Sequence, residues 1–164
     1  MVKEVSSIQQ PIDEGQLAPD FSWKDLYNNT TKKLSDYRGK KRVVVYFYPK
    51  DFTPGCTAEA TEFVKDYKNF QNEDIEVLGV SPDNEESHAN FSKTMGISYP
   101  LVSDTENEVS KKYGVYGLKS FMGREYMGVK RVTFLVDKNG RIIKIFRQVN
   151  PKLHSQEVFD AFSI

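Results

Sequence analysis

Residues 46–59 read YFYPKDFTPGCTAE and contain Cys56, the single cysteine of this chain. The stretch begins inside a run of aromatic and β-branched residues (RVVVYFY, 42–48), which is apolar on both faces and predicts a strand buried in a covered sheet. From Pro54 onward, apolar residues recur at spacings of three and four, which predicts a helix whose buried stripe includes Cys56. The other members of the stripe are Ala60, Phe63, Val64, Tyr67 and Phe70. The chain therefore places its thiol where a buried strand turns into a helix.

The start of this helix determines the chemistry available to Cys56. With Thr53 as the N-cap and Pro54 as the first helical residue, Cys56 lies close to unpaired backbone N–H groups and to the positive end of the helix dipole. Both favour the thiolate, which is the nucleophilic form. Two roles are open to the Thr53 hydroxyl: it caps the Cys56 amide, or it hydrogen-bonds the sulfur or a substrate oxygen. Pro49 either screens the sulfur from water or simply ends the strand.

The remaining sequence alternates between strand and helix patterns, which predicts an α/β fold with a mixed sheet. Two hairpins are expected, one from 21–27 and 30–34 around Asn28-Asn29, the other from 129–136 and 141–146 around the turn DKNG. Further strands are predicted at 75–80 and 100–102. Further helices are predicted at 84–95, before Gly114, and at 153–162.

Composition limits the classes of protein to which the chain can belong. With 164 residues, 38% hydrophobic and 28% charged, it suits one domain over 1–164, with a flexible arm at 1–14. Basic and acidic residues number 23 each, so we expect no nucleic-acid or anionic-membrane partner. The sequence opens without an apolar signal, its longest apolar run is too short to span a bilayer, and a lone cysteine gives no disulfide framework. A cytoplasmic location is expected.

Arg131 is the candidate charge partner for the thiol. On the predicted strand 129–136 it shares a face with Val129, Thr133 and Leu135, which are poor neighbours for a solvated arginine. In a central strand, Arg131 would be partly buried and would face an anion or a developing negative charge. In an edge strand, it would point to water.

These residues resemble the peroxiredoxins, which are thiol peroxidases on a thioredoxin-like fold. The spacing Pro49-x-x-x-Thr53-x-x-Cys56 matches their active-site motif. The context YFYPKDFTPGCTAEATEF, the upstream APDF at 18–21 and the segment GVKRVTFLVDKNGRI are similar to the bacterioferritin comigratory protein (PrxQ) subgroup. The similarity runs from about Gly15 to the C-terminus.

The resemblance implies a thioredoxin-like fold, a central mixed sheet flanked by helices with an N-terminal hairpin. It implies that Cys56 is the peroxidatic cysteine, with Pro49, Thr53 and Arg131 as its partners, and that no metal or organic cofactor is needed. The implied activity is reduction of hydrogen peroxide and organic hydroperoxides through a Cys56 sulfenic acid, as an antioxidant defence. A monomer or a weak dimer is expected.

One position departs from the subgroup. Many members carry a resolving cysteine five residues after the peroxidatic one, where this chain has Thr61. The sulfenic acid therefore cannot be resolved within the chain. We expect an external thiol, from a thioredoxin-like protein or a small molecule, to form a mixed disulfide that a second thiol releases.

For several other polar and aromatic residues, a structural role is favoured over a catalytic one. His88 and His154 lie in helical segments rich in polar residues and are expected at the surface. Glu59 is interpreted as a first-turn acid that favours the helix N-terminus, in preference to a member of the thiol's hydrogen-bond network. For the aromatic-rich segment with Tyr116, Phe121, Met122 and Tyr126, packing is favoured over a border of the peroxide entrance or a subunit contact.

Two alternatives to a peroxidase remain. Cys56 could be a redox switch in a peroxide sensor or a partner-binding protein on the same fold. A thiol hydrolase or transferase would need a histidine beside Cys56. A thioredoxin-type disulfide oxidoreductase is disfavoured because the chain has no Cys-x-x-Cys.

Overall fold

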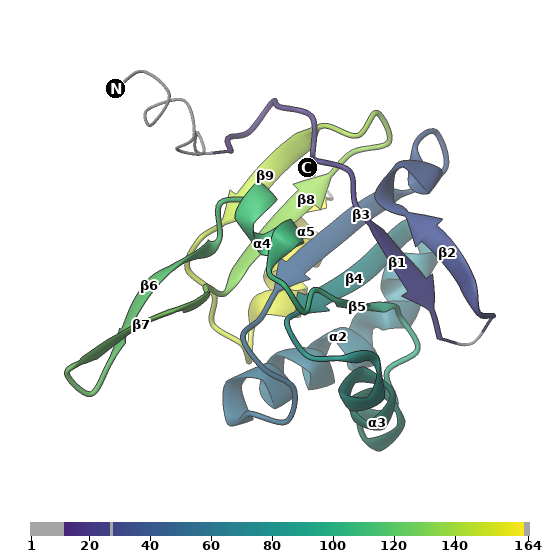
Figure 1. Ribbon diagram of the computed structural model, residues 1–164. Coiled ribbons are helices and arrows are strands. Elements are labelled where there is room, and N and C mark those ends of the chain that lie inside the picture. Colours follow the sequence, from purple (N-terminus) through teal and green to yellow (C-terminus); the bar gives the residue numbers. More distant parts are fainter. Residues whose placement is uncertain (1–11, 27, 163–164) are drawn as a thin grey trace.

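The computed structural model, which describes residues 12–26 and 28–162, is built on a five-stranded mixed sheet of order β5-β4-β3-β8-β9 (Figure 1). The strands are Arg42–Phe47 (β3), Ile75–Ser81 (β4), Leu101–Ser103 (β5), Val132–Val136 (β8) and Ile142–Phe146 (β9). β3 is parallel to β4 and antiparallel to β8, which confirms the predicted buried strand and the mixed α/β sheet.

Two apolar cores lie on the two faces of this sheet, because β3 sends alternate side chains to each. Val45 and Phe47 enter one core, and Val44 and Tyr46 enter the other. The first core is completed by residues of β1 (Ser22–Asp25), the 3-10 turn η1 (Leu34–Tyr37) and α4 (Glu108–Lys112). The second is completed by residues of α2 (Pro54–Asn72), α3 (Glu85–Met95) and α5 (His154–Phe162). Residues near both ends of α2 therefore pack in the core on this face of the sheet.

The N-terminal hairpin is present. β1 pairs antiparallel with β2 (Thr30–Lys33), and Trp23 on β1 is buried in the first core. Tyr27, the last residue of the predicted strand 21–27, lies outside the described residues. So do residues 1–11 of the flexible segment expected at 1–14. Ile12 packs into the first core, and the Gly15 N–H donates to the Ile142 carbonyl at 2.7 Å.

The second predicted hairpin is confirmed as β8 and β9, but the strand predicted at 129–136 begins too early. β7 (Arg124–Val129) ends at the first residue of this segment, and β8 begins at Val132. β7 pairs with β6 (Tyr116–Phe121) in a separate two-stranded ribbon, whereas β8 pairs with β3 and β9. Arg131 therefore lies at the junction between two sheets.

The β6–β7 hairpin was not expected, and Figure 1 shows it extending away from the rest of the molecule. Its turn is formed by Met122 and Gly123, both with positive φ (52° and 78°), as a two-residue turn of this handedness requires. Phe121, Met122 and Tyr126 are 66%, 86% and 46% exposed, so the packing role predicted for them is wrong. Each is in a ribbon with no second layer to cover it.

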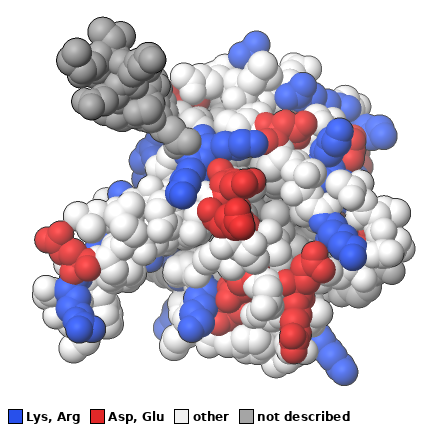
Figure 2. All heavy atoms as spheres, in the orientation of Figure 1, with Lys and Arg blue, Asp and Glu red and all other residues white. Residues whose placement is uncertain are grey.

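Charges of both signs are dispersed over the surface. Figure 2 shows basic and acidic side chains interspersed on one face, without a large patch of either sign. Among the described residues, no helix is long and apolar enough to cross a membrane.

The surface positions predicted for His88 and His154 are wrong, because both side chains are fully buried. His88 is on α3 and His154 begins α5, and exposed polar residues such as Glu85, Glu86, Gln156 and Glu157 occupy the outer faces of these helices. The His154 Nε2 lies 2.8 Å from the Thr133 Oγ1, and its ring meets Phe63 and Phe146 edge-on. Its Nδ1 has no partner among the described residues. Burial, assisted by the Arg131 cation, lowers the pKa of His154 to about 4.

The buried ring of His154 should make the protein sensitive to acid. Between pH 6.5 and about 4 the unfolded chain takes up a proton at His154 that the folded chain does not, so folded stability falls as the pH falls. The difference in unfolding free energy between the wild type and His154→Gln should shrink by about 3 kcal/mol between pH 7 and pH 4. Urea unfolding of both proteins at several pH values measures this difference and cancels the titration of other acids. If the unfolding free energies of the two proteins changed in parallel with pH, the lowered pKa assigned to His154 would be wrong.

Candidate active site

The site is built at the start of α2, as predicted. Thr53 is the N-cap with extended backbone, Pro54 is the first helical residue, and the Thr57 N–H closes the first helical hydrogen bond to the Thr53 carbonyl at 2.8 Å. Cys56 is 2% exposed and is packed in the second core. As the third residue of a 19-residue helix, its amide belongs to the first turn, where the backbone N–H groups have no partner within the helix.

Thr53 does not make the capping bond considered for it. Its side chain makes no cap hydrogen bond, and its hydroxyl instead donates to the Lys50 carbonyl at 2.8 Å. The hydroxyl proton is thereby used within the loop, which leaves the oxygen able to accept a hydrogen bond from a substrate O–H. The backbone amides of the first turn remain available for an oxygen beside the sulfur.

Arg131 reaches the sulfur. Its Nη2 lies 3.3 Å from the Cys56 Sγ, and its side chain is 21% exposed, so the edge-strand alternative is wrong. Gly55 permits this approach, because a Cβ at that position would lie 3.0 Å from the same Nη2. The contact places a fixed positive charge and an N–H donor beside the sulfur.

Glu59 holds the other side of the guanidinium. Its Oε1 accepts from the Arg131 Nη1 at 2.6 Å, and its side chain is fully buried. The predicted first-turn role is wrong because Glu59 lies beyond the first turn, on the same helix face as Cys56. Burial raises the pKa of Glu59 to about 7, although Arg131 opposes the rise. Burial also opposes the charge of Arg131, but Glu59 and Cys56 raise its pKa above the ordinary value, so it remains a cation.

A second cation approaches the site from the β6–β7 hairpin. The Lys119 Nζ donates to the Val129 carbonyl at 2.8 Å, two residues before Arg131. Burial and the charge of Arg131 lower the pKa of Lys119, whereas Cys56 opposes this shift. Sequence reasoning missed Lys119 because its position depends on a hairpin that was not predicted.

Pro49 and Thr61 complete the set of predicted residues. Pro49 is half-buried in the loop between β3 and α2. Thr61 is exposed on α2, and its hydroxyl donates to the Thr57 carbonyl at 2.8 Å. Cys56 is a free cysteine with no second thiol in the chain.

Comparisons with known proteins identify the family of the chain. The AhpC/TSA family model matches residues 15–145. The chain is 45% identical to a protein named Peroxiredoxin Bcp from Bacillus subtilis, over 89% of this chain and 92% of the relative. It is 36% identical to Peroxiredoxin Bcp from Escherichia coli K12, over 92% and 95% of the two chains.

Solved structures show the same fold. A cysteine-to-serine mutant of PrxQ from Xylella fastidiosa superposes with a TM-score of 0.83 and 33% identity, over 94% of this chain and 98% of that one. The bacterioferritin comigratory protein of Xanthomonas campestris, solved in work on its alkyl peroxide reduction, gives a TM-score of 0.80 and 33% identity, over 87% and 90%. The fold is thioredoxin-like, with the N-terminal hairpin. The chain belongs to the AhpC/TSA family, within the bacterioferritin comigratory protein (PrxQ) group of peroxiredoxins.

Proposed function

We propose that this thiol-dependent peroxidase reduces hydrogen peroxide and organic hydroperoxides at Cys56, with Arg131, Thr53 and Pro49 as its catalytic partners. The observation that carries the proposal is the 3.3 Å contact between the Arg131 Nη2 and the Cys56 Sγ in the first turn of α2. The alkyl peroxide reduction reported for the Xanthomonas relative supports the organic substrates.

The chemistry follows from this arrangement. The Cys56 thiolate attacks one peroxide oxygen, an S–O bond forms as the O–O bond breaks, and the second oxygen leaves as hydroxide or alkoxide, which takes up a proton. Negative charge moves from the sulfur to the leaving oxygen. Arg131 and the first-turn amides stabilise this charge in the transition state. Thr53 orients the peroxide by accepting its O–H, and Pro49 limits the access of water. The product is Cys56 sulfenic acid.

An external thiol completes the cycle. It condenses with the sulfenic acid to give a mixed disulfide and water, and a second thiol then releases the Cys56 thiol and a disulfide product. The candidates are a thioredoxin-like protein and a small thiol, because Thr61 stands at the usual resolving position. A reducing compartment such as the cytoplasm supplies such thiols. We further propose an antioxidant role for the chain, acting as one domain and as a monomer or weak dimer.

The alternatives have less support. A redox switch would use the same thiol, but the relatives are named as peroxiredoxins. A thiol hydrolase needs a histidine beside the sulfur. The His88 ring instead contacts Asp51 and Val102, and the Nε2 of His154 contacts Thr133.

The first test follows Cys56 by intact mass. Native protein treated with hydrogen peroxide at neutral pH should gain a single oxygen orders of magnitude faster than urea-unfolded protein, because only the fold supplies Arg131 and the helix amides. Adding a small thiol or a thioredoxin-like protein should then convert the oxidised species to an adduct, and excess thiol should restore the starting mass. Equal rates in native and unfolded protein would favour the switch. A sulfenic acid that no thiol captures would rule out external recycling.

The second test concerns Arg131. Arg131→Ala should slow Cys56 oxidation by about 100- to 1000-fold, as expected for the loss of a charged donor in the transition state. It should also destabilise the fold by about 3 kcal/mol, because it leaves the buried Glu59 unpaired. Adding Glu59→Gln should recover stability but not rate. Lys130→Ala, a change at the exposed neighbouring residue, is the matched control. Unchanged kinetics in Arg131→Ala would show that its assignment is wrong.

A further inference from the structure

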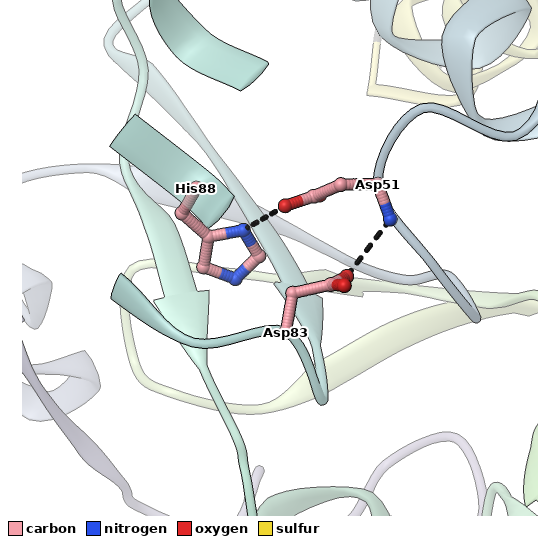
Figure 3. A group of neighbouring side chains, drawn as sticks. All are labelled: Asp51, Asp83 and His88. Atoms are coloured by element: carbon pink, nitrogen blue, oxygen red, sulfur yellow. Dashed lines mark hydrogen bonds and ion pairs between the residues drawn. The ribbon is translucent and has the colours of Figure 1, made fainter. Parts of the chain in front are cut away.

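A second polar cluster lies beside the loop that leads to Cys56. Asp51, in that loop, is 3% exposed, and His88, on α3, is fully buried. Figure 3 shows the His88 ring facing the Asp51 side chain, with Asp83 beside the Asp51 backbone. The His88 Nδ1 lies 2.8 Å from an Asp51 carboxylate oxygen, and the Asp51 backbone N–H donates to Asp83 at 2.8 Å. Nothing in the peroxidase chemistry above uses these residues, although a buried carboxylate and a buried imidazole are costly to maintain.

Hydrogen-bond partners surround Asp51 and His88. The Asp51 carboxylate accepts from the Tyr48 hydroxyl at 2.6 Å and from the Ser87 hydroxyl at 2.8 Å, in addition to its contact with the His88 Nδ1. The other His88 nitrogen, Nε2, lies 3.1 Å from the Val102 carbonyl. Asp51 and His88 are therefore held together inside a buried hydrogen-bond network that joins the loop to α3.

The same hydrogen bonds argue against a metal site. Ligand atoms of Asp51, Asp83 and His88 lie within 4.8 Å of one another, as a metal site would require. However, the His88 Nδ1 already faces the Asp51 carboxylate and its Nε2 faces the Val102 carbonyl, so neither ring nitrogen is free for a cation. The Asp83 Oδ2 already accepts from the Asp51 N–H and, at 2.6 Å, from the Ser81 hydroxyl. The cluster is a closed network of donors and acceptors.

The loop that this network holds is strained. Phe52, directly after Asp51, has a φ of +66°, which is uncommon for a bulky residue. The Phe52 ring packs edge-on against Phe91, with the ring centroids 5.0 Å apart, but Phe52 remains 51% exposed. Burial of its own ring therefore offsets only part of the backbone strain. Thr53, the next residue, is the N-cap of α2. The anchoring of Asp51 therefore offsets the cost of a backbone turn that fixes where α2 begins.

We propose that Asp51 and His88 are positioning residues, which hold the 48–53 loop to α3 and thereby set the Cys56 sulfur against Arg131. The inference rests on the proposed peroxidase function. If the network relaxes, Phe52 can leave its left-handed conformation and the first turn of α2 can shift. Shifts of about 1 Å in a reacting group can cost about 100-fold in rate.

The test compares two reagents at Cys56. Asp51→Asn and His88→Ala should slow oxidation by hydrogen peroxide by about 10- to 100-fold. Iodoacetamide alkylates the same sulfur without an O–O bond for Arg131 and the first-turn amides to polarise, so its rate should fall by far less than the peroxide rate. His88→Asn should recover part of the peroxide rate, because its amide can hydrogen-bond Asp51 in place of Nδ1. A role in stability alone would not produce this split between reagents.

Glu76→Gln is the matched control. Glu76 is also a buried carboxylate, accepting from the Tyr67 hydroxyl at 2.6 Å and the Val77 N–H at 2.9 Å, but it lies at the other end of β4. Its variant should keep the wild-type peroxide rate. If Asp51→Asn does not fold, Ser87→Ala removes a single donor from Asp51 and should give a smaller slowing in the same direction.

The outcomes separate this proposal from the proposed function. Wild-type peroxide rates in folded Asp51→Asn and His88→Ala would overturn the positioning role and leave the peroxidase intact. A rise in wild-type Tm with Zn²⁺ that disappears in Asp83→Asn would also overturn it, by making the cluster a metal site. A wild-type Cys56 no faster with peroxide than the unfolded chain would instead refute the proposed function.

Discussion

The rest of the site depends on one guanidinium shared by two buried groups. Cys56 and Glu59 are three residues apart on the same face of α2, and both are almost completely removed from water. An ionised carboxylate there is tolerable only with a cation beside it, and Arg131, immediately before β8, supplies that cation. Burial raises the pKa of Glu59 and Arg131 opposes the rise. The Arg131 Nη1 donates to this carboxylate, and the Nη2 donates to the sulfur.

This requirement connects the site to the sheet. Arg131 lies immediately before the strand that pairs with β3, and β3 leads through the 48–53 loop into α2. Arg131 is therefore positioned by β8, and Cys56 is positioned through the loop that follows β3, the neighbouring strand. Movement of either strand, or of the loop, changes the distance between charge and sulfur, which makes packing far from Cys56 relevant to its reactivity.

Much of this was predictable because it depends on short-range patterns. The strand at 42–48 follows from six consecutive β-branched or aromatic residues, 43–48, and the start of α2 follows from Thr53, Pro54 and the apolar spacing after them. For Arg131 the sequence left partial burial and a solvent-facing position both open, and the contacts with Cys56 and Glu59 decide for partial burial. Of the neighbours assigned to its face, Leu135 packs in the second core with Cys56, whereas Val129 packs in the first.

Long-range contacts were not predictable in the same way. His88, His154 and Glu59 are polar residues among polar sequence neighbours, which usually indicates a surface position. Their burial is possible because each meets a partner distant in the chain, Asp51, Thr133 and Arg131 respectively. Lys119 likewise depends on the pairing of β6 with β7. A single sequence contains no local signal for such pairs.

The burial of Cys56 has opposite consequences for the two halves of the cycle. At 2% exposure the sulfur is surrounded by protein donors, which favours attack on a peroxide of two oxygens and a small substituent. A thiol reductant is larger, and it must reach the same sulfur because Thr61 offers no internal thiol. The contacts that hold the first turn of α2 in place for the peroxide therefore oppose the approach of the reductant. A chain with one cysteine must balance these demands in the 48–53 loop, since that loop leads directly into the helix turn that carries the sulfur.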